Sequence, residues 1–274
     1  MELLSNSKIA ILGAGKMGET LINSLLKTGV VKKKQMIATA KHAARLEVIA
    51  DNYRVKTTLN NGEAAEFADI VLLCVKPQTT DCVLDEIKKA ISQKQVVISI
   101  VASLTTEIIE KRLGKKVAVI RTMPNTPCLI QKGMTGICAG RFVNDQQLKL
   151  AEHIFQQVGR TLIVDEKYMD AVTGLGASGP AFIYVVIEAM AEGGVKVGLP
   201  RNMATELAAQ AVLGAASMVL ETGEHPALLK DAVTTPAGCT IDGIMEMESG
   251  GLRVTLIKTI VKATERASEL LTTN

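Results

Sequence analysis

Aromatic side chains are scarce in this 274-residue sequence: they make up 3% of the chain, and tryptophan is absent. Proteins that hold single-stranded nucleic acids stack successive bases on such rings, so that means of binding is missing. The net charge is only +3, and the longest run of cations is Lys32 to Lys34. Binding to a nucleic-acid backbone requires a concentrated basic surface. We therefore expect no nucleic-acid partner, and a core built from aliphatic side chains.

Paired cysteines are also lacking, because the five cysteines are odd in number, widely spaced and form no C-x-x-C motif. Such cysteines are typical of small buried residues in a reducing compartment. The N-terminus has no cationic start followed by an apolar run, which a signal peptide would need. We expect a cytoplasmic protein with no bound metal.

Long hydrophobic runs are missing as well. The most apolar stretch extends from Pro180 to Glu192. Glu188 and Glu192 interrupt it well short of the roughly 18 apolar residues that indicate a membrane-spanning helix. We therefore expect no membrane partner.

What is present first is an alternation of strand-like and helical patterns over residues 1–165. Short β-branched runs begin at Lys8, Gln35, Asp69, Gln95 and Val117, and two more begin near Met134 and Thr161. Helical patterns separate them, for example over 16–27, 80–91 and 145–157. Because several runs are apolar on both faces, they fit a parallel sheet that helices cover. This rhythm predicts an α/β Rossmann-type doubly wound sheet.

After residue 165 no further strand is indicated. Helical patterns cover 181–195, 203–220, 241–248 and 252–271, and they are apolar around nearly their whole circumference. Such helices must be buried, and about 110 residues are too few to bury all four by themselves. We predict a Rossmann-like NADP-binding domain over 1–165, followed by an all-α substrate and dimerisation domain over 166–274. A second subunit should cover its helices.

The motif G-A-G-K-M-G follows the first strand and opens a helix. In a dinucleotide-binding turn, Gly13 permits the tight bend and Gly15 lets the backbone approach a pyrophosphate. Gly18 lets the helix pack on the strand, and the helix N-terminus faces the phosphates. In this strand–turn–helix context the motif predicts dinucleotide binding rather than a plain glycine turn.

The end of the second strand indicates which dinucleotide is bound. A cofactor without a 2′-phosphate needs an acidic residue there, but A-T-A-K-H-A-A-R has no Asp or Glu before Glu47. It offers Thr39, Lys41, His42 and Arg45 instead, which could also be an ordinary solvated helix start. This pattern favours NADPH and leaves NADH as the less favoured alternative.

Two proline-containing segments follow later strands, where the crevice of such a sheet lies. They are V-K-P-Q, from Val75, and R-T-M-P-N-T-P, from Arg121. The prolines stiffen backbone that would otherwise move. A third segment, T-T-P-A-G-C-T from Thr234, interrupts the helical region with turn residues. Its backbone N–H groups and hydroxyls could hold a small carboxylate, although an ordinary cap between two helices is the simpler interpretation.

Taken in order, these blocks resemble pyrroline-5-carboxylate reductase over nearly the whole chain. The matching blocks are G-A-G-K-M-G, V-K-P-Q, M-P-N-T-P, D-A-V-T-G-L-G-A-S-G-P-A-F, G-G-V-K-V-G-L-P, L-K-D-A-V-T-T-P-A-G-C-T-I and E-S-G-G-L-R. The chain departs at Ala177, where Gly is common, and at Phe182, where Tyr is common. The resemblance implies NAD(P)H-dependent reduction of 1-pyrroline-5-carboxylate to L-proline. It also implies a homodimer through the C-terminal helices, with a decamer as a larger assembly.

The resemblance also assigns roles to individual residues. Those implied to contact the cofactor are Gly15, Lys16 and Met17 at the pyrophosphate, Asn61 at the adenosine end, Val75, Lys76 and Pro77 along the nicotinamide ribose, and Asn125 near the ring. Those implied to line the substrate pocket are Ser178, Gly179, Thr235, Gly238, Cys239 and Thr240. We expect the Thr240 hydroxyl to bond the ring nitrogen, as the catalytic group, while Thr235 and the Gly238–Cys239 backbone hold the carboxylate.

The chemistry agrees with an imine substrate. Reducing a ketone needs a positioned acid or base, most often His, yet none of the three histidines falls in the predicted crevice. A protonated imine needs only a hydride. Asp170 is the one tempting acid, and we expect it to start or cap a helix.

Three other functions remain open at this point. A β-hydroxyacid dehydrogenase needs a catalytic Lys early in the long helix, and no Lys precedes Lys196 there; an imine reductase of related type is a similar alternative. A non-catalytic dinucleotide-binding relative should have lost the Thr235–Thr240 turn, which is intact.

Overall fold

The computed structural model describes residue 4 and residues 6–272. The chain divides into two compact units: Met1–Ser178 with Ala263–Asn274, here called the sheet unit, and Gly179–Lys262, here called the helical unit. The division predicted after residue 165 differs from this one, because the segment after the last strand packs with the sheet: Met169 is fully buried against Met123 and Cys138. The predicted domain boundary stays a prediction.

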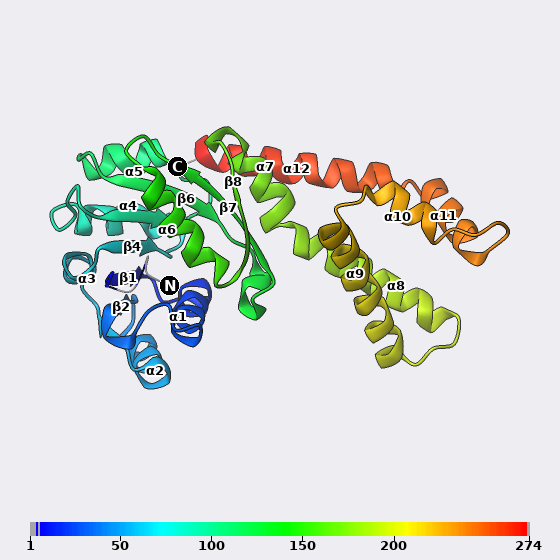
Figure 1. Cartoon of the computed structure of the whole chain (residues 1–274), viewed down its shortest axis with the longest axis horizontal. Coiled ribbons are helices and arrows are strands. Elements are labelled where there is room, and N and C mark those ends of the chain that lie inside the picture. The colour runs from blue at the N-terminus through cyan, green and yellow to red at the C-terminus, as the bar shows by residue number, and fades with distance from the viewer. Residues whose placement is uncertain (1–3, 5, 273–274) are drawn as a thin grey trace. The chain divides into compact units, whose positions relative to one another are not determined.

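The sheet unit is built on one eight-stranded sheet of order β3-β2-β1-β4-β5-β6-β7-β8 (Figure 1). The strands are β1 (Ile9–Leu12), β2 (Met36–Thr39), β3 (Lys56–Thr58), β4 (Ile70–Leu73), β5 (Val96–Ser99), β6 (Ala118–Met123), β7 (Gly133–Ala139) and β8 (Gly159–Ile163). All neighbours pair in parallel except β6 and β7. The β6–β7 link is too short for the crossover helix that a parallel pair requires. The predicted Rossmann-type sheet is confirmed.

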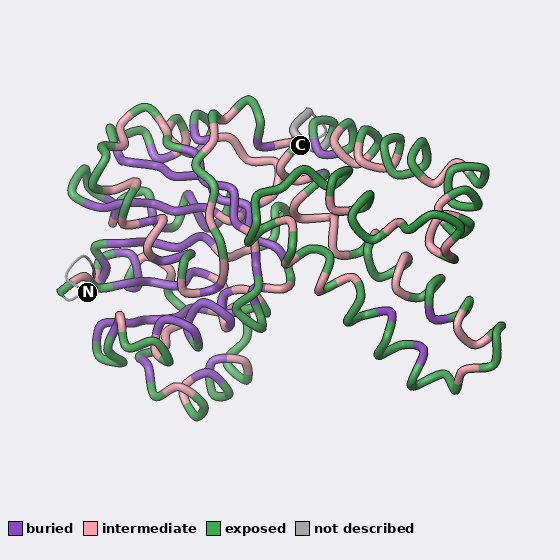
Figure 2. Tube along the Cα trace, turned by 45° about the vertical axis from the view of Figure 1, so that its right-hand side comes forward, coloured by how far each residue is buried: buried purple, intermediate pink, exposed green. Residues whose placement is uncertain are grey.

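Helices cover both faces of this sheet. They are α1 (Lys16–Lys27), α2 (Ala43–Tyr53), α3 (Asn61–Phe67), α4 (Pro77–Ile87), α5 (Thr106–Leu113), α6 (Asp145–Gln156) and α7 (Met169–Val172), with short turns η1 (Lys33–Gln35), η2 (Thr126–Ile130), η3 (Glu166–Tyr168) and the π-helix η4 (Thr173–Ala177). Alternate strand residues face opposite layers: Ile9 and Ile11 pack in the core of α1, α2 and α6, whereas Ala10 and Leu12 pack in the core of α3, α4 and α5. Figure 2 shows these strands as long buried tracts. Strands buried on both faces explain the continuous apolar runs of the sequence.

The helical unit contains α8 (Gly179–Lys196), α9 (Arg201–Thr222), α10 (Pro226–Ala232), α11 (Cys239–Ser249) and the first part of α12 (Leu252–Thr272). Its buried cluster consists of Ala191, Ala204 and Ala208. Large apolar side chains are exposed on it, with Val185 64% and Leu207 57% accessible. The four predicted helices are present as α8, α9, α11 and α12, and the chain by itself leaves them largely uncovered.

By length and mean hydropathy alone, two helical stretches could cross a membrane: Glu166–Lys196 and Arg201–Thr222, each with a mean hydropathy of 1.4. The sequence analysis underestimated the length of the first stretch, because its helix continues on both sides of the apolar run and spans 31 residues. Core helices of soluble proteins pass the same test.

Candidate active site

The glycine-rich turn after β1 requires its glycines for steric reasons. Gly13 has a φ of +98°, and a Cβ atom there would lie 2.8 Å from the Cys74 carbonyl oxygen. A Cβ atom at Gly18 would lie 2.3 Å from the Gly13 carbonyl oxygen, so only glycine lets α1 approach the turn this closely. A Cβ atom at Gly15, by contrast, would meet no other atom within 4 Å. The open side of the turn is therefore at Gly15.

The N-terminus of α1 at this opening is free to bind an anion. Gly15 is the N-cap, and it has no side chain that could accept a hydrogen bond from the first amides of the helix. Lys16 is exposed and Met17 is half-buried beside it. Unpaired amides at a helix N-terminus, together with the helix dipole, favour a phosphate group. This geometry fits the predicted pyrophosphate contact.

A pocket of about 450 Å³ lies beside the turn in the sheet unit. It brings together residues from five segments, which are Gly13, Thr39, Ala40, Lys41, Leu59, Asn61, Val75, Thr79, Cys82, Val83 and Glu86. Five of these, Gly13, Thr39, Lys41, Asn61 and Val75, are predicted cofactor residues. We call it the adenosine pocket, because it adjoins the ends of β1 and β2 where that half of a dinucleotide binds.

The cations near this pocket have different roles. The Arg45 guanidinium donates to the Ala14 carbonyl at 2.7 Å and pairs with Glu19 at 2.5 Å. Arg45 therefore braces the turn against α1. His42 is the N-cap residue of α2 and does not line the pocket, whereas Lys41 is exposed and does. Of the three predicted cations, Lys41 is the one that lines the pocket.

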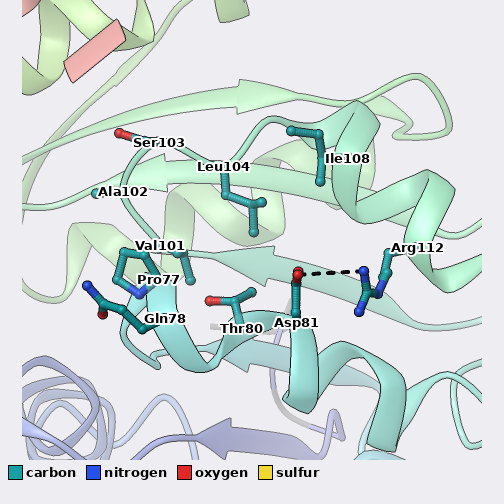
Figure 3. A pocket seen from close by; sticks show the side chains of 10 residues that line it. All are labelled: Pro77, Gln78, Thr80, Asp81, Val101, Ala102, Ser103, Leu104, Ile108 and Arg112. Carbon is teal, nitrogen blue, oxygen red and sulfur yellow. Dashed lines mark ion pairs between the residues drawn. The ribbon is translucent and has the colours of Figure 1, made fainter. Parts of the chain in front are cut away.

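The segment V-K-P-Q begins α4. Lys76 is the N-cap and Pro77 the first helical residue, where its missing N–H costs nothing. A second cavity of about 420 Å³ lies between the first turns of α4 and the residues after β5. Figure 3 shows Pro77 and Gln78 at one end of it and the ion pair between Asp81 and Arg112 at the other. Because Arg112 also pairs with Asp85 at 2.8 Å, its charge is balanced within the protein.

Asn125 has a bracing role that the sequence did not reveal. Its Oδ1 accepts from the Met134 amide and its Nδ2 donates to the Gly176 carbonyl, both at 2.9 Å. The side chain thus ties the end of β6 to β7 and to the π-helix η4, which Ser178 directly follows. The predicted contact between Asn125 and the nicotinamide ring stays a prediction.

Arg121 is a buried cation in β6 that pairs with two carboxylates from the segment after β8. Arg121 is 2% exposed and lies 3.2 Å from Asp170 and 3.7 Å from Glu166. Glu166 also accepts from the amide and the hydroxyl of Thr106, at 2.8 and 2.7 Å, and Asp170 accepts from the Ser268 hydroxyl at 3.0 Å. Asp170 lies at the start of a helix, as expected, in the first turn of α7; its carboxylate pairs with Arg121 rather than capping that helix. A charged residue at the end of the apolar run V-A-V-I-R was the available signal.

The turn in the helical unit joins α10 to α11. The Gly238 amide donates to the Thr235 carbonyl at 3.0 Å, and Ala237 has a φ of +57°. Proline at the second position and a left-handed residue at the third describe a type II turn, in which glycine normally takes the third place. A Cβ atom at Gly238 would lie 2.4 Å from the Thr235 hydroxyl oxygen, so a larger residue here would force the Thr235 side chain to move.

Thr240 does not act as a cap in this turn. Gly238 is the N-cap of α11, and it has no side chain with which to cap the helix. Thr240 is half-buried, and within residues 4 and 6–272 its hydroxyl has no hydrogen-bond partner. The amides of the first turn of α11 and the Thr240 hydroxyl are therefore both available to a ligand. Cys239, beside it, is exposed.

Two family models match the chain. The one described as pyrroline-5-carboxylate reductase dimerisation matches residues 166–270, and the one described as NADP oxidoreductase, coenzyme F420-dependent, matches residues 8–103. Curated relatives agree with the first. The pyrroline-5-carboxylate reductase of Methanosarcina acetivorans is 42% identical over 97% of this chain and 99% of its own length. That of Synechocystis is 41% identical over 96% of this chain and 98% of its own.

Solved structures give the same result. A pyrroline-5-carboxylate reductase from Coxiella burnetii superposes with a TM-score of 0.91 at 37% identity, over 96% of this chain and 98% of the other. The pyrroline carboxylate reductase of Plasmodium falciparum, solved with NADP bound, superposes with a TM-score of 0.87 at 29% identity, over 97% and 98% of the two chains.

Proposed function

The chain belongs to the pyrroline-5-carboxylate reductase family, and from that premise we propose how its residues carry out the reaction. The enzyme reduces 1-pyrroline-5-carboxylate to L-proline, and NADPH supplies the hydride. The observation that carries the assignment is the match of both sequence and fold over nearly the whole chain. The alternatives left by the sequence, a β-hydroxyacid dehydrogenase or a non-catalytic relative, have no comparable support.

The sheet unit provides the features that a dinucleotide requires. The adenosine pocket holds the adenosine end, with Lys41 facing the 2′-phosphate and Thr39 and Asn61 lining the ribose. The open side of Gly15 and the free amides before Lys16 and Met17 receive the pyrophosphate. Val75, Lys76 and Pro77 lead from there along the carboxyl ends of the strands. These assignments rest on the steric fit at the turn and on the pocket volume of about 450 Å³.

The helical unit provides the features that a small amino-acid-like substrate requires. Amides at the start of α11, together with Thr235, Gly238 and Cys239, hold the carboxylate. Gly179, at the start of α8, lines the ring together with Ser178, the residue of the sheet unit that precedes it. The Thr240 hydroxyl bonds the ring nitrogen. The imine nitrogen carries a proton before reaction, so hydride addition to the neighbouring carbon completes the C–N–H group and needs no acid from the protein. The distribution of histidines agrees, because none lies in the adenosine pocket or in the Thr235–Thr240 turn.

Two copies of the chain should form the working enzyme. Large apolar side chains on α8 and α9 are exposed, and the family model that covers this region is a dimerisation model. We propose a homodimer through the helices after residue 166, with a decamer as the larger assembly. Light scattering at micromolar concentration should give at least twice the 29.2 kDa of one chain. An active monomer would contradict the proposal.

The location of the protein is proposed on chemical grounds. All five cysteines are free in the structure, which suits a reducing compartment. Burial raises the pKa of the Cys74 and Cys138 thiols to about 12, so neither is poised to react. We therefore retain the cytoplasm as the proposed location.

The experiment that tests the function follows the absorbance of NADPH in the presence of purified protein. Addition of 1-pyrroline-5-carboxylate should start oxidation of NADPH and yield proline. In the oxidative direction, NADP⁺ with 3-hydroxyisobutyrate should give no more signal than the sample without substrate. Binding of NADPH without turnover of the imine would instead support a non-catalytic relative.

A further inference from the structure

The adenosine pocket contains a carboxylate, although the segment at the end of β2 has no acidic residue to supply it. It belongs to Glu86, in the last turn of α4, and it lines the pocket together with Thr39, Lys41 and Asn61. Sequence spacing predicts an acidic residue of this pocket only at the end of the second strand. The fold instead places an acidic residue from a distant helix there.

Glu86 is bonded to Asn61, which the resemblance places at the adenosine end. The Asn61 Nδ2 donates to the Glu86 carboxylate at 2.7 Å, and the Thr39 hydroxyl donates to the Asn61 Oδ1 at 2.6 Å. The Thr39 hydroxyl oxygen in turn accepts from the Gly13 amide at 3.2 Å. A continuous chain of hydrogen bonds therefore runs from α4 through Asn61 to the glycine-rich turn.

The chemistry of these hydrogen bonds determines which way the Asn61 amide faces. An ionised carboxylate can only accept hydrogen bonds, whereas an amide has a donor side and an acceptor side. With its sides exchanged, Asn61 would set its carbonyl oxygen against the Glu86 carboxylate. The other oxygen of that carboxylate accepts from the Cys82 thiol at 3.2 Å, which holds the group in place. Glu86 thus favours one of the two amide orientations.

We propose that Glu86 is a positioning residue for cofactor binding: it fixes the Asn61 amide, so that one known set of donor and acceptor sites faces the adenosine ribose. The proposal rests on the assignment of this pocket to the adenosine end of NADPH. Glu86 acts through Asn61, and its own carboxylate need not contact the cofactor.

A double-mutant cycle on ligand affinity tests this role. The probes are NADPH and 2′,5′-ADP, which carries only the adenosine end, and the dissociation constants are measured by titration without substrate. Glu86→Leu should raise both constants by roughly three- to tenfold, the amount one hydrogen bond is worth. In an Asn61→Ala background, Glu86→Leu should have no further effect, because its target is gone. At saturating NADPH, kcat should stay within about twofold of the wild-type value.

Asp85→Leu is the matched control. Asp85 precedes Glu86 on α4, but its carboxylate pairs with Arg112 and does not line the adenosine pocket. This variant also removes one charge from the helix, and it should leave both dissociation constants unchanged. Glu86→Gln is the second variant. It keeps a side chain of equal length with an acceptor oxygen, but its new amide also has a donor and therefore tolerates Asn61 with the two sides of its amide exchanged. Its constants should fall between those of the wild type and Glu86→Leu.

Three results would overturn the proposal. The first is an unchanged affinity in Glu86→Leu, and the second is a full, additive effect of Glu86→Leu on top of Asn61→Ala. The third is tighter binding of 2′,5′-ADP by Glu86→Gln, which would mean that Glu86 acts by its charge on the phosphate. If the wild-type protein binds NADPH but not 2′,5′-ADP, the assignment of the pocket itself fails.

Discussion

Thr240→Ala separates a substrate contact from a structural role. The structure predicts a small effect on stability, because Gly238 rather than Thr240 caps α11 and the Thr240 hydroxyl has no partner within the described residues. The cost of about 1 kcal/mol for a lost cap should not arise. The substitution removes only a hydroxyl and a methyl group from a half-buried side chain, so the free energy of unfolding should change by less than about 1 kcal/mol.

The kinetic effect should be much larger. A hydrogen bond to a charged partner contributes about 1.5–3 kcal/mol. If the Thr240 hydroxyl bonds the ring nitrogen in the transition state, its loss should lower kcat/KM for the imine by roughly ten- to a hundredfold. The affinity for NADPH should not change, since the cofactor residues are not touched.

The assay measures kcat/KM for 1-pyrroline-5-carboxylate and the unfolding midpoint on the same preparation. Thr234→Ala serves as a control, because its hydroxyl lies in the same turn but already donates to the Lys230 carbonyl at 2.8 Å. That variant should keep wild-type kinetics. A Thr240→Ala protein that unfolds early and turns over normally would refute the reasoning and leave the turn as scaffold.

Three further predictions follow from other parts of the chain. Lys41→Glu should reduce the preference for NADPH over NADH by about tenfold, measured as the ratio of kcat/KM values; equal use of both cofactors by the wild type would contradict this. Ala237→Gly should stabilise the protein by roughly 0.5–1 kcal/mol in denaturant unfolding, because relief of the left-handed conformation exceeds the added entropy of the unfolded chain; a loss of stability would show that Ala237 is not strained. The hydrogen bond to the Glu86 carboxylate raises the pKa of Cys82, because it favours the protonated thiol. Glu86→Gln should therefore lower that pKa and speed the labelling of Cys82 by a thiol reagent at about pH 8. Cys138 should stay unlabelled, and bound NADPH should shield Cys82.

Local patterns predicted most of the sheet unit because each local preference agrees with the fold. The strand from Lys8 and the glycine-rich turn identify β1 and the start of α1, and α1 spans the predicted residues. The strand β3 was missed, because it has three residues and is only partly buried, so it carries no apolar run. The antiparallel β6–β7 pair depends on loop length rather than on the pattern of either strand.

The candidate site shows where such reasoning stops. Gly13 and Gly18 could be predicted, because a turn of this kind imposes backbone geometry on its own residues. The partners of Arg45, Asn125 and Asp170 could not, because each comes from a segment distant in sequence. Glu86 is the clearest case, since its place beside Asn61 follows only from how α3 and α4 pack on the sheet.

One measurement tests the central claim most directly: transfer of label from the nicotinamide to the substrate. NADPH carrying deuterium at both C4 positions is incubated with the wild-type protein and 1-pyrroline-5-carboxylate, and the proline is analysed by mass spectrometry and NMR. The account predicts one deuterium per proline, on the ring carbon that was double-bonded to nitrogen. Proline without that deuterium, or consumption of NADPH without proline, would contradict direct hydride transfer to the imine.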